Sequence, residues 1–450
     1  METTRRIGVT IAVFLLLNLL SADGRDAVGS ATDAGFARQV VETTAAPRIV
    51  TVPHTAAAPP TATVPHTAAA PRIVTVPHTA AAPPYGGGSP YGDGSPSPTT
   101  TTTTTTTLPP LDPLTFESLD RINMIRDFSK YVSSGRSRWE RSVPGIEQLR
   151  IISTADGAEQ PVFWLAPSGD RDQPVLVILH SWSAPYTQHA GIPFAMWAQE
   201  NGWAVIVPEF RGKNDDADAV GSDLAVQDTV DAIDYAVAQA GVDTNRVYVV
   251  GYSGGGMMGL LLAGRHPDKV SAVSVWGPPH DLVEFYEHAR RKGLGYASDI
   301  RRACGGDPRD AGSAQEECLT RSPATYLEAA RDQAVPIFIA QGIRDQFVPP
   351  SVGAEVFNQL AHPDDRLSAE EVDLFGRGRV PGHLSITTET YFGDGDPAPV
   401  FARQSGRALL VYFQSSHEMV YNASARWFAS DPQLGKRSSL ANVARSKAPV

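Results

Sequence analysis

The stretch VYVVGYSGGGMMGLLLAG, from Val247 to Gly264, places one serine between glycines where the sequence pattern changes. The residues before it are β-branched and aromatic, as in a buried strand, and the apolar residues after it have helical spacing. Ser253 is therefore predicted at a sharp corner between a strand and a helix, the context in which a G-x-S-x-G serine is a nucleophile. A phosphate-binding loop would instead carry Lys followed by Ser or Thr, where Met257 and Met258 stand.

The regions around this corner alternate short apolar runs with amphipathic stretches. Nearly continuous apolar runs indicate strands buried on both faces of a mostly parallel sheet. The predicted strands are 148–154, 161–166, 175–180, 204–208, 246–250, 270–276, 336–340 and 408–414. The predicted helices are 192–201, 222–240, 254–264, 351–360 and 420–429. This alternation predicts a doubly wound α/β domain, with an eight-stranded sheet and helices on both faces, over residues 147–432.

A serine nucleophile needs a base and an acid, and in this fold type both follow the serine in the chain, each after the carboxyl end of a strand. Asp345 follows the strand in VPIFIAQGIRDQFVPPS, and His417 follows the strand in ALLVYFQSSHEM. The other readings are a solvated loop aspartate and a histidine that caps the last helix. His383 is the competing base, but no strong parallel strand precedes it, which favours His417.

Two backbone N–H groups that face each other across the site are candidate oxyanion donors, those of Trp182 and Gly254. Trp182 follows the third predicted strand in VLVILHSW, where a tryptophan that only packs in the core is the alternative. Tyr186, Trp276 and Phe347 are candidate substrate-binding residues, and each is equally well explained as a core aromatic.

The chain contains two cysteines, Cys304 and Cys318, within a predicted small lid at about 280–330. In an exported protein the simplest interpretation is one disulfide that closes a loop, with two unpaired thiols as the alternative. The segment has too few ligand residues for a zinc site, and the proposed chemistry needs no metal and no organic cofactor.

The N-terminal residues 1–22 have the features of a signal peptide. Two arginines precede a mostly apolar run from Ile7 to Leu20, which is short for a membrane span and is followed by small residues. An uncleaved anchor is the alternative, and we expect a secreted or extracytoplasmic protein. The net charge of −11, with scattered Lys and Arg, argues against nucleic-acid partners and against a polybasic membrane patch.

Residues 23–113 form a predicted disordered spacer. The unit APRIVTVPHTAA recurs with variation between Ala46 and Ala81, and a run of threonines extends from Thr99 to Thr107. This composition cannot bury enough apolar surface to offset the ordering of the backbone. Such spacers are often glycosylated, and this one is a candidate for attachment to a cell wall or surface. A helical lead-in at 114–146 precedes the domain, and 433–450 is a predicted flexible tail. The oligomeric state is left open.

The sequence resembles the α/β-hydrolase superfamily, and within it the prolyl-oligopeptidase-type catalytic domain and related secreted esterases. The resemblance lies in NRVYVVGYSGGGMMGLLLAGRHPDKVSAVSVWGPPHDL, RSPATYLEAARDQAVPIFIAQGIRDQFVPPSVGAEVF and SSHEM, and extends over about Glu147 to Ser430. It implies a Ser253–Asp345–His417 triad, in agreement with the residues chosen from the pattern.

Two departures from that family affect the expected function. The β-propeller that usually precedes the catalytic domain is replaced here by the spacer, and many relatives have Gly where Ser181 stands. Without a propeller to limit substrate size, a small ester is nearly as plausible a substrate as a peptide. The expected function is hydrolysis of peptide or carboxylic ester bonds, and the alternatives are a carboxylesterase proper or a non-catalytic binding module on a stalk.

Overall fold

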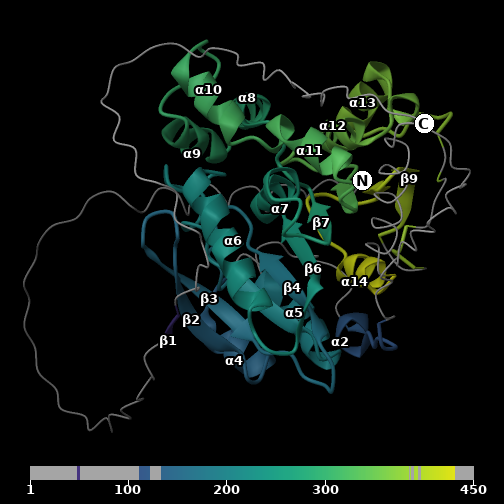
Figure 1. Cartoon of the computed structure of the whole chain (residues 1–450). Coiled ribbons are helices and arrows are strands. Elements are labelled where there is room, and N and C mark those ends of the chain that lie inside the picture. The colour runs from purple at the N-terminus through teal and green to yellow at the C-terminus, as the bar shows by residue number, and fades with distance from the viewer. Residues whose placement is uncertain are drawn as a thin grey trace, which may run out of the picture. The chain divides into compact units, whose positions relative to one another are not determined.

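The computed structural model describes residues 48–50, 111–121, 133–384, 386, 390–393 and 397–430. These residues form a ten-stranded sheet in the order β1-β2-β3-β5-β4-β6-β7-β8-β10-β9 (Figure 1). The strand β3 runs antiparallel to β2 and β5, and β9 runs antiparallel to β10, whereas all other neighbours pair in parallel. The α/β-hydrolase fold class predicted from the sequence is confirmed.

All eight predicted strands are present, with shifts of a few residues at their ends. The strands are β1 Arg48–Val50, β2 Glu147–Ile152, β3 Glu159–Leu165, β4 Gln173–Leu179, β5 Ala204–Pro208, β6 Val242–Tyr252, β7 Ala272–Trp276, β8 Ile337–Gly342, β9 Pro399–Ser405 and β10 Ala408–Phe413.

The predicted number of eight strands is too low, because two edge strands were missed. The strand β9 is half-buried and carries Arg403 and Gln404, so it lacks the continuous apolar run of the central strands. The three residues of β1 lie in the Pro-rich spacer and pair with the edge strand β2. The spacer therefore contains this one ordered strand. Its other residues, apart from 111–113, lie outside the described ranges, as do the predicted signal peptide 1–22 and the tail 433–450.

All five predicted helices are present, with ends shifted by at most three residues, and the described residues contain further helices that the sequence pattern did not predict. The α-helices are α2 Glu117–Asp120, α4 Arg136–Ser142, α5 Ile192–Glu200, α6 Asp223–Val237, α7 Gly254–Arg265, α8 Leu282–Lys292, α9 Tyr296–Ala303, α10 Ser313–Thr320, α11 Leu327–Asp332, α12 Ser351–Leu360, α13 Ala369–Gly376 and α14 Tyr421–Ala429. Short 3-10 turns lie at His189–Gly191, Pro323–Thr325 and Pro363–Asp365.

Two apolar layers hold the helices against the two faces of the sheet. Along β4, Val175 and Val177 belong to one buried cluster with residues of α6, α7, α11 and α12. Leu176 and Ile178 belong to the other cluster, with residues of α4, α5 and α14. Because successive side chains of a strand point to opposite faces, a continuous apolar run is what a strand covered on both sides requires.

The segment 280–330, here called the lid, folds as α8 to α11 (Figure 1). A disulfide joins Cys304, directly after α9, to Cys318 in α10, with their Cα atoms 5.2 Å apart. The guanidinium of Arg321 donates to the carbonyls of Ala217 and Ala219, at 2.8 and 2.9 Å, and so ties the lid to the loop before α6.

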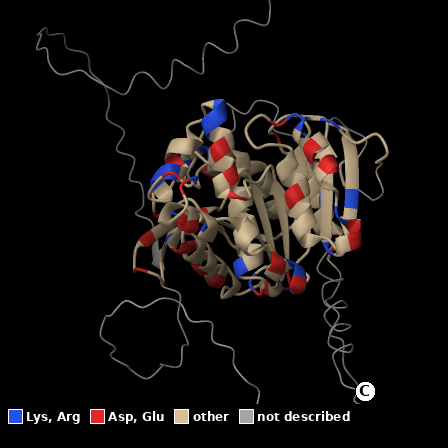
Figure 2. Ribbon diagram, turned by 90° about the horizontal axis from the view of Figure 1, so that it is seen from above, with Lys and Arg blue, Asp and Glu red and all other residues tan. Residues whose placement is uncertain are grey.

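Acidic and basic residues lie interspersed over the described helices (Figure 2). None of the helices in the described ranges is both long and apolar enough to cross a membrane.

Candidate active site

Ser253 lies at the corner where β6 ends and α7 begins. Its backbone has φ +56°, a conformation that is unusual and strained for a residue with a Cβ atom. The Ser253 N–H donates to the Trp276 carbonyl at 2.8 Å, which ties the corner to the end of β7. A Cβ atom at Gly255 would lie 2.3 Å from the Leu179 carbonyl oxygen, so only glycine allows α7 to begin this close to β4. The corner therefore has the geometry of a nucleophile elbow.

Asp345 and His417 form a buried pair on the loops after β8 and β10. The Nδ1 atom of His417 lies 2.6 Å from Oδ2 of Asp345, and both side chains are at most 2% exposed. Oδ1 of Asp345 accepts the N–H groups of Phe347 and Val348 at 2.9 and 3.0 Å, and Oδ2 also accepts Nε2 of Gln341 at 2.9 Å. These donors fix the carboxylate, so its orientation toward the imidazole is preset.

Contacts between the Ser253 corner and the loops that carry Asp345 and His417 bring the serine and the buried pair to one edge of the sheet. The hydroxyl of Tyr252, the residue before Ser253, donates to the His417 carbonyl at 2.7 Å. A Cβ atom at Gly277, the residue after β7, would lie 3.0 Å from Nδ1 of His417 and 3.2 Å from Oδ2 of Asp345. The strands β6, β7, β8 and β10 are consecutive parallel neighbours, so their carboxyl ends meet at this edge.

The two candidate oxyanion donors lie against each other. A Cβ atom at Gly254 would lie 2.6 Å from the backbone nitrogen of Trp182, so the two backbones are in contact. Within the described part of the chain, the Trp182 N–H donates to no acceptor. An N–H group without a protein acceptor, beside the start of a helix and next to Ser253, is what an oxyanion site needs.

Ser181, which stands where many relatives have glycine, is integrated into this loop. Its N–H donates to Oε1 of Gln188 at 2.9 Å, and its Oγ accepts from Nε2 of the same amide at 2.7 Å. Gln188 thus holds the residue before the candidate donor through two hydrogen bonds. Sequence reasoning missed Gln188, because a glutamine in an irregular loop carries no pattern that indicates its partner.

Of the three predicted substrate-binding aromatics, only Phe347 is half-buried beside the pair, with its ring 5.5 Å from that of His417. The prediction for Trp276 is wrong: it is 0% exposed, packs among aromatic rings including Phe338, and donates through Nε1 to Oγ of Ser424. Its position as the last residue of β7 turns the side chain into the layer between sheet and helices.

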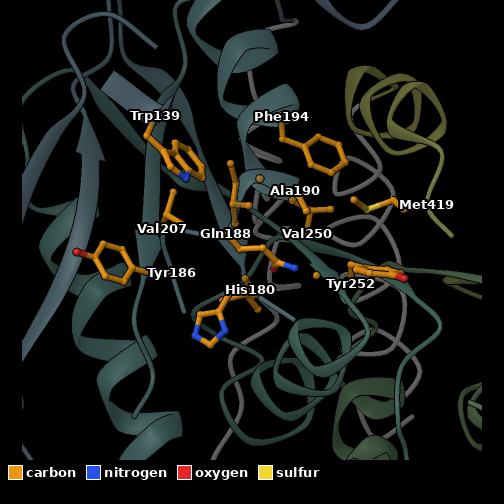
Figure 3. A pocket seen from close by; sticks show the side chains of 14 residues that line it. Trp139, His180, Tyr186, Gln188, Ala190, Phe194, Val207, Val250, Tyr252 and Met419 are labelled. Carbon is orange, nitrogen blue, oxygen red and sulfur yellow. The ribbon is translucent and has the colours of Figure 1, made fainter. Parts of the chain in front are cut away.

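The prediction that Tyr186 binds substrate in an open pocket is also wrong. Its ring packs on Phe163 and its hydroxyl accepts from Gln148, while burial raises its pKa to about 12. It lines a small cavity of about 20 Å³, together with Gln188 and Met419 (Figure 3). A volume of this size holds about one water molecule, so the cavity is not a substrate pocket.

His180, on the wall of that cavity, is fixed by its neighbours. Its ring stacks on Phe210 with centroids 3.8 Å apart, and Nε2 lies 3.3 Å from Oε1 of Glu209. Burial works to raise the pKa of Glu209, but the nearby His180 and the N–H groups of Tyr186 and Gly212 outweigh it and lower that pKa. The charged carboxylate thus anchors the end of β4, directly before the oxyanion loop.

The competing histidine lies elsewhere. The side chain of His383 is 70% exposed, and its Nε2 lies 2.8 Å from Oε1 of Glu371 in α13. Asp345 is paired with His417 instead, which agrees with the choice made from the sequence.

A wide cleft of about 1040 Å³ opens beside the Asp345 loop, between α8 of the lid and α12 and α13. Glu355 in this cleft lies near Glu284, and burial followed by that like charge raises its pKa to about 7. Sequence reasoning did not predict this cleft, since it depends on how the lid lies against α12. Across the described ranges, no group of three or more His, Cys, Asp or Glu side chains is placed to hold a metal ion.

Comparisons with known proteins support the predicted resemblance. A family model described as the prolyl oligopeptidase family matches residues 194–373, which include Ser253 and Asp345. Feruloyl esterase B of Thermothelomyces thermophilus is 30% identical over 24% of this chain and 40% of its own length. An uncharacterized peptidase, YtmA, of Bacillus subtilis is 28% identical over 33% of this chain and 54% of its own length.

Among solved structures, an acylaminoacyl peptidase of Pyrococcus horikoshii has a TM-score of 0.40 and 15% identity, over 50% of this chain and 36% of that chain. The chain spans about half the length, or less, of the two curated relatives named above, at 40% and 54%. The resemblance to the prolyl oligopeptidase family is confirmed, and the matches support a serine hydrolase.

Proposed function

We propose that this chain, similar to the prolyl oligopeptidase family over residues 194–373, is an exported serine hydrolase that cleaves peptide or carboxylic ester bonds. The observation that carries the proposal is the meeting of a strained serine, at φ +56°, with a buried Asp345–His417 pair at one sheet edge. Strain of this kind persists only where the surrounding structure enforces it, as it does at a nucleophile elbow.

The reaction proceeds by acyl transfer in two steps. His417 accepts the Ser253 proton at Nε2 while the oxygen attacks the substrate carbonyl, and the resulting oxyanion is bound by the N–H groups of Trp182 and Gly254. The imidazolium then protonates the leaving alcohol or amine, whose bond to the carbonyl breaks. Water repeats the sequence on the acyl-enzyme, which releases the acid and restores Ser253. Asp345 orients Nδ1 and stabilises the imidazolium, since its carboxylate is held at 2.6 Å.

The bond that is cleaved is proposed as ester or amide, because both classes appear among the relatives. One relative is named a feruloyl esterase and another a peptidase. Turnover of a panel of p-nitrophenyl esters, compared with that of aminoacyl and prolyl p-nitroanilides, separates the two. Efficient amide cleavage assigns a peptidase, and ester cleavage alone assigns a carboxylesterase.

A fluorophosphonate probe followed by mass mapping tests the nucleophile. We expect labelling at Ser253 that is lost in Ser253→Ala, with thermal stability retained, and a matched exposed serine, Ser298→Ala, as control. His417→Ala should lower labelling strongly, whereas His383→Ala should leave it unchanged. Absence of labelling in a folded wild-type protein would contradict the proposal and favour the binding-module alternative.

Export and surface attachment are proposed from the N-terminal sequence. A signal peptide at 1–22 would route the chain out of the cytoplasm, and the spacer at 23–113 would hold the domain away from a wall or surface. N-terminal sequencing of protein from culture medium and cell envelope tests both. A protein that retains residues 1–22 and stays in the cytoplasmic fraction would contradict them.

A further inference from the structure

The side chain of Trp182, whose N–H is the candidate oxyanion donor, is held by the lid. Its Nε1–H donates to Oδ2 of Asp299 in α9 at 3.1 Å. The rings of Phe285 in α8 and Tyr296 in α9 lie at steep angles to the indole, with centroids 6.0 and 5.5 Å away. Trp182 is 3% exposed, so the lid encloses an indole whose backbone belongs to the active-site loop.

The backbone of the same loop is held from the other side. Gln188 binds both the N–H and the hydroxyl of Ser181, as described above. The start of α7 at Gly254 lies against the backbone nitrogen of Trp182. The backbone around Trp182 is thus restrained at Ser181 and Gly254, and the contacts of the indole with the lid are a further restraint on the same residue.

Asp299 is suited to hold that indole. Its side chain is 17% exposed, and burial raises the pKa of the carboxyl, although the Trp182 N–H works against that rise. Arg302, one turn later in α9, lies 3.5 Å from Oδ1 and balances the charge. A hydrogen bond to a carboxylate is roughly twice as strong as one between neutral groups, so the charge of Asp299 strengthens this contact between lid and loop.

We propose that Asp299 is a positioning residue for acyl transfer. Through the indole it directs the Trp182 N–H toward the developing oxyanion, so that the oxyanion site is complete only when α9 is docked. This inference rests on the function proposed above. An oxyanion donor acts mainly in the transition state, so displacing it lowers kcat and leaves KM nearly unchanged. Removal of a whole donor costs about 100- to 1000-fold in kcat, and a displaced donor is expected to cost about 10- to 100-fold.

The test compares full-length variants in the hydrolysis of a p-nitrophenyl ester. Asp299→Leu removes the carboxylate that accepts from the indole. Trp182→Phe removes the indole N–H but keeps an aromatic ring and the backbone N–H, and Asp299→Asn retains an oxygen that can accept. We expect the first two to lower kcat about 10- to 100-fold with KM within about threefold, and Asn to restore kcat to within about threefold of wild type. The double variant should be no slower than the slower single variant, because both changes break one interaction.

Tyr286→Phe is the matched control, since it removes the 3.1 Å hydrogen bond to Asp307 in the same lid and should leave kcat unchanged. Wild-type kcat in Asp299→Leu, an effect on KM alone, or additive losses in the double variant would each overturn the inference. Should Asp299→Leu not fold, the kcat of Trp182→Phe decides, because the inference fails if that kcat equals wild type. Without Ser253-dependent turnover in the wild type, the proposed function fails as well, which distinguishes the two failures.

Discussion

Replacement of Gly277 by alanine should disable the active site while the protein stays folded. The residue has φ +53°, and a Cβ atom there would lie 3.0 Å from both Nδ1 and Cε1 of His417 and 3.2 Å from Oδ2 of Asp345. Ordinary van der Waals contact begins at about 3.4 Å and extends to about 4 Å. The new methyl group therefore has to push the imidazole and carboxylate away by roughly 0.4 to 1 Å.

Two costs follow from this change, and they have different magnitudes. An alanine in the left-handed region loses about 1–2 kcal/mol of folding free energy, because its Cβ approaches the following carbonyl oxygen. A displacement of about 1 Å at reacting groups lowers the rate by about 100-fold. We therefore expect kcat/KM to fall by about 10- to 100-fold, with a modest decrease in Tm.

The control is Gly157→Ala, in the turn between β2 and β3. Gly157 also has positive φ, at +80°, but a Cβ atom there meets nothing within 4 Å. It should show a similar loss of Tm and wild-type kcat/KM for a p-nitrophenyl ester. If Gly277→Ala hydrolyses the ester within twofold of Gly157→Ala, the reasoning about the crowded pair is refuted.

Three further changes test the electrostatics and the lid. Glu355→Gln should raise the Tm at pH 8 but not at pH 4. The pKa of the Glu355 carboxyl is raised from 4.5 to about 7, so its ionisation as pH rises through that range lowers the free energy of unfolding, on the order of 1–3 kcal/mol, and glutamine avoids that loss. Arg211→Met should cost about 3 kcal/mol or more in denaturant unfolding, since it leaves the fully buried Asp228 carboxylate unpaired. Reduction of the Cys304–Cys318 disulfide should cost about 3 kcal/mol by the chain-entropy account, visible as a lower Tm in a reducing agent.

Matched surface variants control for the first two of these changes. Glu328→Gln alters a 75% exposed carboxyl on α11 and should leave the pH dependence of Tm unchanged. Arg377→Met breaks an exposed ion pair with Asp373 and should cost less than about 1 kcal/mol. A loss in Arg377→Met equal to that in Arg211→Met would contradict the argument from burial. A Tm unaffected by reduction, with thiols shown to be free, would contradict the role of the disulfide.

The central part of the site was predictable because it depends on local patterns and chain order. A strand, a glycine-flanked serine and an apolar helix specify the corner at Ser253, and the ends of later parallel strands place Asp345 and His417 on the same edge. The pocket residues were not predictable in this way. Trp276 ends β7 and Tyr186 lies in the loop after β4, yet both side chains are buried in packed layers. The direction of such a side chain follows from the distant elements that pack around it.

The fold class, the corner at Ser253 and the order of serine, acid and base follow from local patterns, because periodicity and glycine positions act over a few residues at a time. Which side chains support that chemistry depends on the tertiary structure. Gln188 reaches Ser181, Gln341 reaches Asp345, and Asp299 reaches Trp182 across 117 positions. Such contacts depend on how the lid and loops pack on a finished sheet, and their geometry is set when distant apolar surfaces are buried together.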